Sequence, residues 1–216
     1  MEITWLGHSC FRLRGREGSV VTDPFDKSVG YSLGRVTADV VTVSHGHPHH
    51  ANFAGVSGTD GEPRLLDGPG EYEVKGIVIS GFRTYHDGEG GKARGKNTAF
   101  LIEMEGVVVC HLGDLGHVLT AQQVEAMSDV DVLLVPVGGY TTINAAQAAE
   151  VISLIEPKLV VPMHYRTPGG PADLEPVDRF LRQMGAPSVE PQPRLVAGAG
   201  SLPEVTQVVL LESRRG

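Results

Sequence analysis

The sequence predicts a layered α/β sandwich, and the distribution of its apolar residues supports this fold class. Short runs rich in β-branched residues, separated by turn residues, dominate the N-terminal half of the 216-residue chain. In the C-terminal half, buried strands alternate with helices. The 28 glycines and 14 prolines are scattered between short apolar runs, which indicates many tight turns rather than a disordered segment. We therefore expect a single domain over residues 1–216.

The strands of the N-terminal half are expected wherever a short apolar run lies between turn residues. The run at 39–44 (DVVTVS) is almost continuously apolar, as expected for a strand that is covered on both faces. The Glu105–Gly106 step between two apolar runs predicts a hairpin turn. The other strands are expected at 3–7, 10–14, 19–23, 76–82, 98–104 and 106–112.

Helices and strands alternate in the C-terminal half. The clearest helix is expected at 143–157, where apolar residues keep a helical spacing and Pro157 ends the helix. Another helix is expected at 119–129, with Thr120 as its N-cap. The remaining elements are a helix at 176–185 and strands at 131–138, 158–164 and 205–213.

Composition limits the partners and the compartment that we expect. The formal net charge of −8 argues against a nucleic-acid or anionic-membrane partner, because phosphate groups attract basic surfaces. Cys10 and Cys110 lie in apolar runs and are expected to be buried, reduced thiols. No uncharged apolar run approaches the ~18 residues that span a bilayer, and no signal peptide is expected. We expect a cytoplasmic protein that binds a small molecule, and homo-oligomers remain possible.

Four of the nine histidines fall within six positions, in the stretch 40–55 (VVTVSHGHPHHANFAG). Neutral imidazole is a common ligand of zinc and similar metals. His45 and His47 can leave the chain on the same side just beyond a strand, and His50 follows in the next turn. Three histidines at the spacing H-x-H-x-x-H after a buried strand therefore predict a metal site.

A longer series of motifs resembles the metallo-β-lactamase fold hydrolases. The series is SHGHPHHAN, then YH at 85–86, HLGD at 111–114 and VPMHY at 161–165. The family signature is H-x-H-x-D-H, followed by a histidine, an aspartate and a final histidine. The resemblance runs from Thr4 to about Thr167. The phrases TWLGHSCF, HLGDLGH and PVGGYTTINAAQAAEVI are more closely similar to a subgroup of proteins like L-ascorbate-6-phosphate lactonase.

The resemblance implies a four-layer αββα sandwich that binds one or two metal ions. Zn²⁺ is the first choice, with Mn²⁺ and Fe²⁺ as alternatives. Asp114 would bridge two ions and take part in catalysis. The side chains that would bind the ions are His45, His47 and His86 at the first site, and His50 and His164 at the second.

Further residues are expected around the metals. Asp23 matches an aspartate that supports the metal site in the family, although an aspartate before Pro24 is also a common turn initiator. His8, at an early strand end, is either a pocket-wall or substrate contact or a histidine without a functional role. Lys92, Arg94 and Lys96 lie among glycines, in a loop that is either solvated and mobile or a flexible flap that binds an anionic substrate.

Position 49 departs from the family pattern, because His49 stands where the family has an aspartate. His49 ligates the second metal, or it swings out and leaves that site weak or empty, or the site holds metal and catalyses poorly. Loss of the carboxylate leaves one negative charge less to hold two dications. We favour participation of His49 at the metal. His49 is also the candidate proton acceptor, since free imidazole titrates near about 6.5.

Together these residues predict a metal-dependent hydrolase. A bound Zn²⁺ or Mn²⁺ lowers the pKa of water from about 15.7 toward ~7, and the hydroxide would attack an ester, lactone or phosphodiester. The substrate is expected to be small and anionic. One alternative is a phosphodiesterase or nuclease of the same fold. The other is a non-catalytic metal-binding protein whose second site is degenerate.

Overall fold

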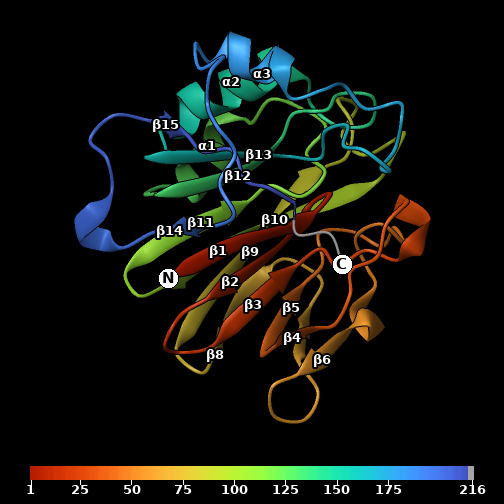
Figure 1. Ribbon diagram of the computed structural model, residues 1–216, viewed down its shortest axis with the longest axis vertical. Helices are drawn as coiled ribbons and strands as arrows, with labels where there is room; N and C mark the ends of the chain where they lie inside the picture. Colours follow the sequence, from red (N-terminus) through yellow and green to blue (C-terminus); the bar gives the residue numbers. More distant parts are fainter. Residues whose placement is uncertain (214–216) are drawn as a thin grey trace.

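The computed structural model describes residues 1–213, which build two β-sheets packed face to face (Figure 1). The six-stranded sheet has the order β14 (Leu195–Val196), β1 (Glu2–Gly7), β2 (Cys10–Arg14), β3 (Ser19–Thr22), β5 (Val40–Thr42), β7 (Arg64–Leu66). The seven-stranded sheet has the order β15 (Gln207–Val208), β13 (Leu159–Met163), β12 (Val132–Pro136), β11 (Val107–His111), β10 (Lys96–Met104), β9 (Ile77–Tyr85), β8 (Gly70–Val74).

Alternation of side chains along a strand decides which core each residue joins. Val20 of β3 and Val40 of β5 join the large core between the two sheets. Val21 and Val41, one position further along, join a smaller core on the outer face of the six-stranded sheet. Every residue of β5 is buried, so this strand is covered on both faces, as its apolar run predicted.

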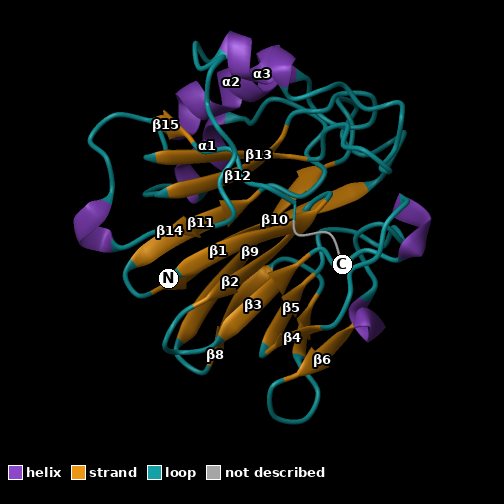
Figure 2. Ribbon diagram, viewed as in Figure 1, coloured by secondary structure: helices purple, strands orange, loops and turns teal. Residues whose placement is uncertain are grey.

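Three α-helices lie together on the outer side of the seven-stranded sheet, beside β12 and β13 (Figure 2). The predicted N-cap Thr120 is confirmed, and it forms a capping box with Gln123. Asn144 caps the second helix in the same way. Within the described residues, no helix has the length and apolar character needed to cross a membrane. The helices are α1 (Ala121–Ala126), α2 (Ala145–Ile155) and α3 (Asp178–Gln183).

The outer face of the six-stranded sheet is covered by short segments instead of the α-helical layer expected there. Val29, Val36 and Val56 pack from these segments onto the smaller core. Glycines and prolines interrupt this part of the sequence, and both residues disfavour long helices. The α/β fold class is confirmed, but this outer layer differs from the expected one. The covering segments are β4 (Val36–Ala38), β6 (Val56–Gly58) and 3-10 helices at Lys27–Val29 and Phe53–Gly55.

Strands of both sheets direct their carboxyl ends toward one edge of the sandwich. In the six-stranded sheet, β1, β3 and β5 run in the same direction. In the seven-stranded sheet, β9, β11 and β13 also share a direction. Loops from distant parts of the sequence gather at this edge (Figure 1). Open sheets commonly build their binding sites at such carboxyl ends.

The predicted hairpin turn at Glu105–Gly106 is confirmed. Both residues have positive φ (52° and 69°), as a two-residue type I′ turn requires. The predicted strand at 205–213 is wrong for most of its length, because only Gln207–Val208 is a strand. β8 was not predicted, because the run is short and its two apolar side chains, Tyr72 and Val74, are only partly buried.

Asp39 fastens the cover of the six-stranded sheet to β3. Its carboxylate accepts hydrogen bonds from Ser19 N (2.8 Å) and Ser19 Oγ (3.0 Å), from Lys75 Nζ (2.7 Å), and from Thr59 Oγ1. Burial alone would raise the pKa of Asp39, but Lys75, Thr59 and Ser19 outweigh burial and lower it to about 2.

We expect Asp39→Asn to lower the free energy of unfolding at pH 7 by about 1.5–3 kcal/mol, because charged hydrogen bonds are lost. The pKa of Asp39, about 2, lies below its usual value of about 3.9, so its stabilisation is present above pH ~4 and is lost as pH falls toward 2. Urea unfolding across this pH range measures the difference. The exposed neighbour Asp60 is the matched control. Asp60→Asn should change stability by less than about 0.5 kcal/mol, and equal losses would contradict the assignment.

Candidate metal centre

Polar side chains that lie within three residues of the ends of six strands meet at the shared edge. Three of these residues, His8, Asp23 and His164, have positive φ (52°, 40° and 51°), which is uncommon for residues other than glycine. Such backbone conformations are unfavourable by about 1–3 kcal/mol each and are concentrated at functional sites. The six strand-end residues are His8 (β1), Asp23 (β3), His45 (β5), His86 (β9), Asp114 (β11) and His164 (β13).

Asp23 orients two histidines. Its buried carboxylate accepts hydrogen bonds from Ser44 N (2.7 Å) and Ser44 Oγ (2.5 Å). His50 Nδ1 lies 2.8 Å from Asp23 Oδ2, and His45 Nδ1 lies 3.0 Å from Ser44 Oγ. Since the Ser44 hydroxyl donates its proton to Asp23, it accepts one from His45 Nδ1. Both histidines therefore carry a proton on Nδ1, and Nε2 is the atom each can offer to a metal.

The carboxylate of Asp114 is the meeting point of three imidazoles. Its Oδ2 lies 3.3 Å from His50 Nε2, 3.4 Å from His86 Nε2 and 3.3 Å from His164 Nε2. Burial alone would raise the pKa of Asp114, but His164 and His50 lower it well below its usual range. Burial alone would lower the pKa of His50, but Asp114 and Asp23 raise it to about 10. A metal bound at His50 Nε2 therefore has to replace a proton.

A buried oxygen without a partner fits the presence of a metal ion. Asp114 Oδ1 is buried without a hydrogen-bond partner. Such a group destabilises a fold by about 1–3 kcal/mol. Imidazole nitrogen and carboxylate oxygen together suit Zn²⁺ and similar ions. Three groups of described residues bring possible ligand atoms within 4.8 Å of one another: His45, His86 and Asp114; Asp23, His45 and His50; and His8, His50 and His164.

Two of these histidines have lowered pKa values. Burial, aided by the nearby His50, lowers the pKa of His45 to about 4. Burial also lowers the pKa of His86, although Asp114 opposes this effect. Both imidazoles are therefore neutral at pH 7, and neutral imidazole is the form that binds metals.

His47 and His49 lie at the margin of the cluster. Neither is a member of the three groups found among the described residues. His47 is exposed, and its Nδ1 accepts a hydrogen bond from His49 N (3.2 Å). The half-buried ring of His49 lies edge-on to the rings of His47 and His8, with centroid distances of 4.6 and 5.5 Å. Both His47 and His49 line a cavity of about 270 Å³ above the cluster.

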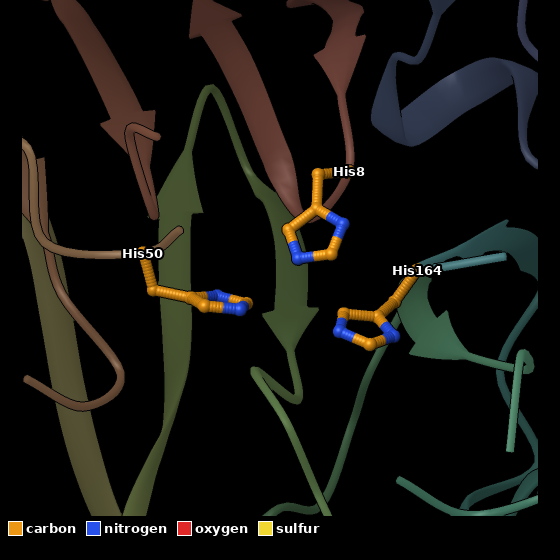
Figure 3. Close-up of side chains that lie close together, drawn as sticks. All are labelled: His8, His50 and His164. Atoms are coloured by element: carbon orange, nitrogen blue, oxygen red, sulfur yellow. The ribbon is translucent and has the colours of Figure 1, made fainter. Parts of the chain in front are cut away.

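His8 lies inside the cluster (Figure 3). The centroid of its ring is 4.2 Å from that of His164 and 4.9 Å from that of His50. Its carbonyl oxygen accepts hydrogen bonds from Trp5 Nε1 (3.0 Å) and His164 N (3.1 Å), so its backbone is held from two sides. The prediction of a pocket-wall or substrate contact did not place this histidine within reach of two others.

A second, open cavity lies beside His45 and His86, and two cationic side chains line it. Arg94 and Lys96 line it, together with His45, His47 and His86. Lys92, which the sequence paired with Arg94, is exposed in the same loop and does not line this cavity. Two of the three cations of the predicted stretch, Arg94 and Lys96, thus line the cavity beside the site.

Asp87 organises the loop that carries Arg94. Its carboxylate accepts four backbone hydrogen bonds, from the N–H groups of Glu89, Gly91, Ala93 and Arg94. The N–H of Arg94 and the other three lower the pKa of Asp87 to about 2. These bonds hold the loop in a defined turn, where a flexible segment was expected.

Two glycines let the loops of the site approach one another closely. A Cβ atom on Gly116 would lie 2.3 Å from the carbonyl carbon of His86. A Cβ atom on Gly138 would lie 2.1 Å from the carbonyl oxygen of His164. Larger residues at these positions would displace two of the three histidines beside Asp114.

Two supporting residues were not predicted. Ser44 connects Asp23 to His45, and its place directly before the histidine cluster could have suggested this role. Asn97 holds the loop of Asp114: its Oδ1 accepts from Asp114 N (3.0 Å), and its Nδ2 donates to the carbonyl of Leu112 (2.9 Å). Asn97 carries no signal in the sequence, because its position depends on strand pairing across the sheet.

A two-sheet sandwich with a histidine–aspartate cluster at its carboxyl edge defines a metal-binding protein of the metallo-β-lactamase fold. Comparison with known proteins agrees: the family model described as the beta-lactamase superfamily domain matches residues 2–164. A UPF0173 metal-dependent hydrolase from Archaeoglobus fulgidus is 30% identical over 195 residues, which cover 77% of this chain and 84% of the relative. The chain belongs to the metallo-β-lactamase superfamily and, within it, to the UPF0173 metal-dependent hydrolase family.

Solved structures give the same relationship. A crystal structure from Thermotoga maritima, described as a proposed Zn-dependent hydrolase of the metallo-β-lactamase superfamily, is 44% identical, with a TM-score of 0.80 and 97% of each chain covered. Igni18, a metallo hydrolase from Ignicoccus hospitalis, is 22% identical, with a TM-score of 0.64 over 91% of this chain and 98% of the other. The likeness to Igni18 is one of fold.

We expect Asp23→Asn to weaken zinc binding by roughly 10- to 100-fold, because an amide cannot accept all the hydrogen bonds that orient His45 and His50. Isothermal titration of the metal-free protein measures this change. Asp67 is the matched control, since it directly follows β7 and is exposed. Asp67→Asn should bind zinc like the wild type, and wild-type affinity in Asp23→Asn would contradict the role of Asp23.

Proposed function

We propose that this metal-dependent hydrolase cleaves an ester, lactone or phosphodiester bond of a small anionic substrate, with one or two Zn²⁺ ions at the histidine–aspartate cluster. The convergence of three Nε2 atoms on Asp114 Oδ2 is the observation that carries the proposal. Mn²⁺ and Fe²⁺ are the alternative ions. The names of the relatives, which describe metal-dependent and Zn-dependent hydrolases, support the reaction class.

The proposed ligands divide between the two sheets. Asp114 would be shared by both ions, and its lowered pKa keeps it ionised for this purpose. A divalent ion bound there supplies a water of lowered pKa and a positive charge that stabilises a developing oxyanion. Asp23 orients the imidazoles without contacting the ions. The proposed ligands are His45, His47 and His86 for the first ion, and His50 and His164 for the second.

His49 is the proposed proton acceptor. It lines the cavity above the cluster and is half-buried. Because its ring lines the cavity in which a substrate would lie, the imidazole is placed for proton transfer. Participation of His49 as a ligand remains the alternative that its position in the sequence suggests.

The cations of the open cavity support an anionic substrate. Arg94 and Lys96 lie beside His45 and His86 in a protein whose formal net charge is −8. A local positive patch on an acidic protein favours a phosphate or carboxylate at that place. The resemblance to L-ascorbate-6-phosphate lactonase supports a lactone that carries a phosphate. A nuclease is the weaker alternative, because the net charge opposes a nucleic-acid partner.

We also propose that residues 1–216 act as one domain in the cytoplasm. The large core contains residues from Met1 to Leu211, which supports one structural unit over the described chain. Cys10 and Cys110 are buried, free thiols, as is usual in a reducing compartment.

A substrate panel tests the proposed reaction. Metal-free protein is supplied with Zn²⁺, Mn²⁺ or Fe²⁺ and assayed on lactones, carboxylic esters, thioesters and phosphodiesters. We expect hydrolysis only with metal, and its loss in Asp114→Asn. If the protein binds metal but hydrolyses none of these substrates, the non-catalytic alternative, which the substitution at position 49 favours, is the better account.

Charge reversal tests whether the open cavity lined by Arg94 and Lys96 binds an anionic substrate. We expect Arg94→Glu to raise the KM for an anionic substrate by roughly three- to tenfold with little change in kcat, because an exposed ion pair contributes about 0.2–1 kcal/mol and reversal adds repulsion. Lys92→Glu is the matched control, since Lys92 lies in the same loop but does not line this cavity. Equal effects of the two variants would indicate a general charge effect and remove the specific role of Arg94.

A further inference from the structure

One histidine of the buried cluster has no part in the proposed assignments. His8 forms a group with His50 and His164, in which each residue offers a ring nitrogen within 4.8 Å of the others (Figure 3). All three are buried, with exposed fractions of 3%, 1% and 4%. Two nitrogens bound to one Zn²⁺ at 2.0–2.1 Å are at most about 4.2 Å apart. The three rings therefore need only small rotations to share one ion.

The position of His8 is built into the fold. Its φ of 52° is unfavourable for a residue other than glycine and persists only where the surroundings enforce it. The enforcing contacts are the hydrogen bonds from Trp5 Nε1 and His164 N to its carbonyl oxygen. The second bond ties the backbone of His8 directly to another member of the same group.

The histidine at position 49 leaves the second ion without the carboxylate ligand that the resemblance implies. The resemblance places a carboxylate ligand of the second ion at position 49, and this chain has His49 there. His49 belongs to none of the three groups, whereas His8 lies with the two remaining ligands of that ion. The ring of His8 thus occupies a place from which it can supply the missing ligand.

We propose that His8 is a ligand of the second metal ion, which it binds together with His50 and His164. This inference rests on the proposed function, because it assumes a metal-dependent site. Asp114 is then the one carboxylate shared by the two ions, and the second site is rich in nitrogen. Nitrogen-rich sites favour Zn²⁺ over Mn²⁺, which prefers oxygen ligands.

Metal titration of His8→Asn tests the proposal. Asparagine tolerates a positive φ and removes the imidazole. Metal-free protein is titrated with Zn²⁺ by calorimetry and with Co²⁺ by visible absorption. We expect two ions in the wild type. In His8→Asn, the first ion should bind as in the wild type and the second at least roughly tenfold more weakly.

A double variant and a control sharpen the result. His8→Asn combined with His49→Asp returns a carboxylate to position 49 and should recover the second ion. His117→Asn removes a histidine outside the cluster, whose ring nitrogens are bonded to Tyr85 N and the Val118 carbonyl. It should bind two ions like the wild type. Circular dichroism and thermal unfolding establish that each variant is folded, and His8→Gln replaces His8→Asn if the latter is not.

The outcomes separate this proposal from the proposed function. Two ions bound with wild-type affinity by a folded His8 variant would overturn the role of His8, and so would a single ion in the wild type. Neither result contradicts the proposed hydrolase function if the substrate panel shows metal-dependent turnover. Conversely, a wild type that needs His8 for its second ion but hydrolyses nothing would leave the site intact and overturn the reaction.

Discussion

The buried charge of Asp114 is the interaction on which the rest of the site depends. A carboxylate removed from water is strongly unfavourable unless charged or hydrogen-bonding partners compensate. Here the partners are imidazoles of His50, His86 and His164, each within 3.4 Å of the same oxygen. They come from loops after β5, β9 and β13, so both sheets have to pack correctly before the charge is satisfied. The site at the edge therefore depends on the packing of the two sheets against each other.

A second buried carboxylate, Asp23, gives the cluster its direction. It determines, directly for His50 and through Ser44 for His45, which ring nitrogen carries a proton and therefore which nitrogen can bind an ion. The left-handed backbone at His8, Asp23 and His164 destabilises the fold locally. The absence of side chains at Gly116 and Gly138 lets the loops approach one another in this arrangement. Burial of apolar side chains in the core between the sheets offsets the unfavourable backbone conformations at this edge.

Sequence patterns predicted the parts of this molecule that rest on local periodicity or on motif order. Buried strands such as β5, the helix α2 and the turn at Glu105–Gly106 follow from short-range rules. Short, partly exposed strands such as β8 give only a weak pattern, and the expected second helical layer came from the family resemblance. The meeting of His8 with His164 could not be predicted, because it arises from contacts between residues more than 150 positions apart.

Anomalous diffraction at the zinc absorption edge, from crystals grown with Zn²⁺, tests the central claim most directly. A metal centre organised by Asp114 predicts anomalous peaks at about 2.0–2.2 Å from its carboxylate oxygens and from Nε2 of His50, His86 and His164. Peaks that bind none of these atoms, or histidine peaks that leave Asp114 without a metal, would contradict the account.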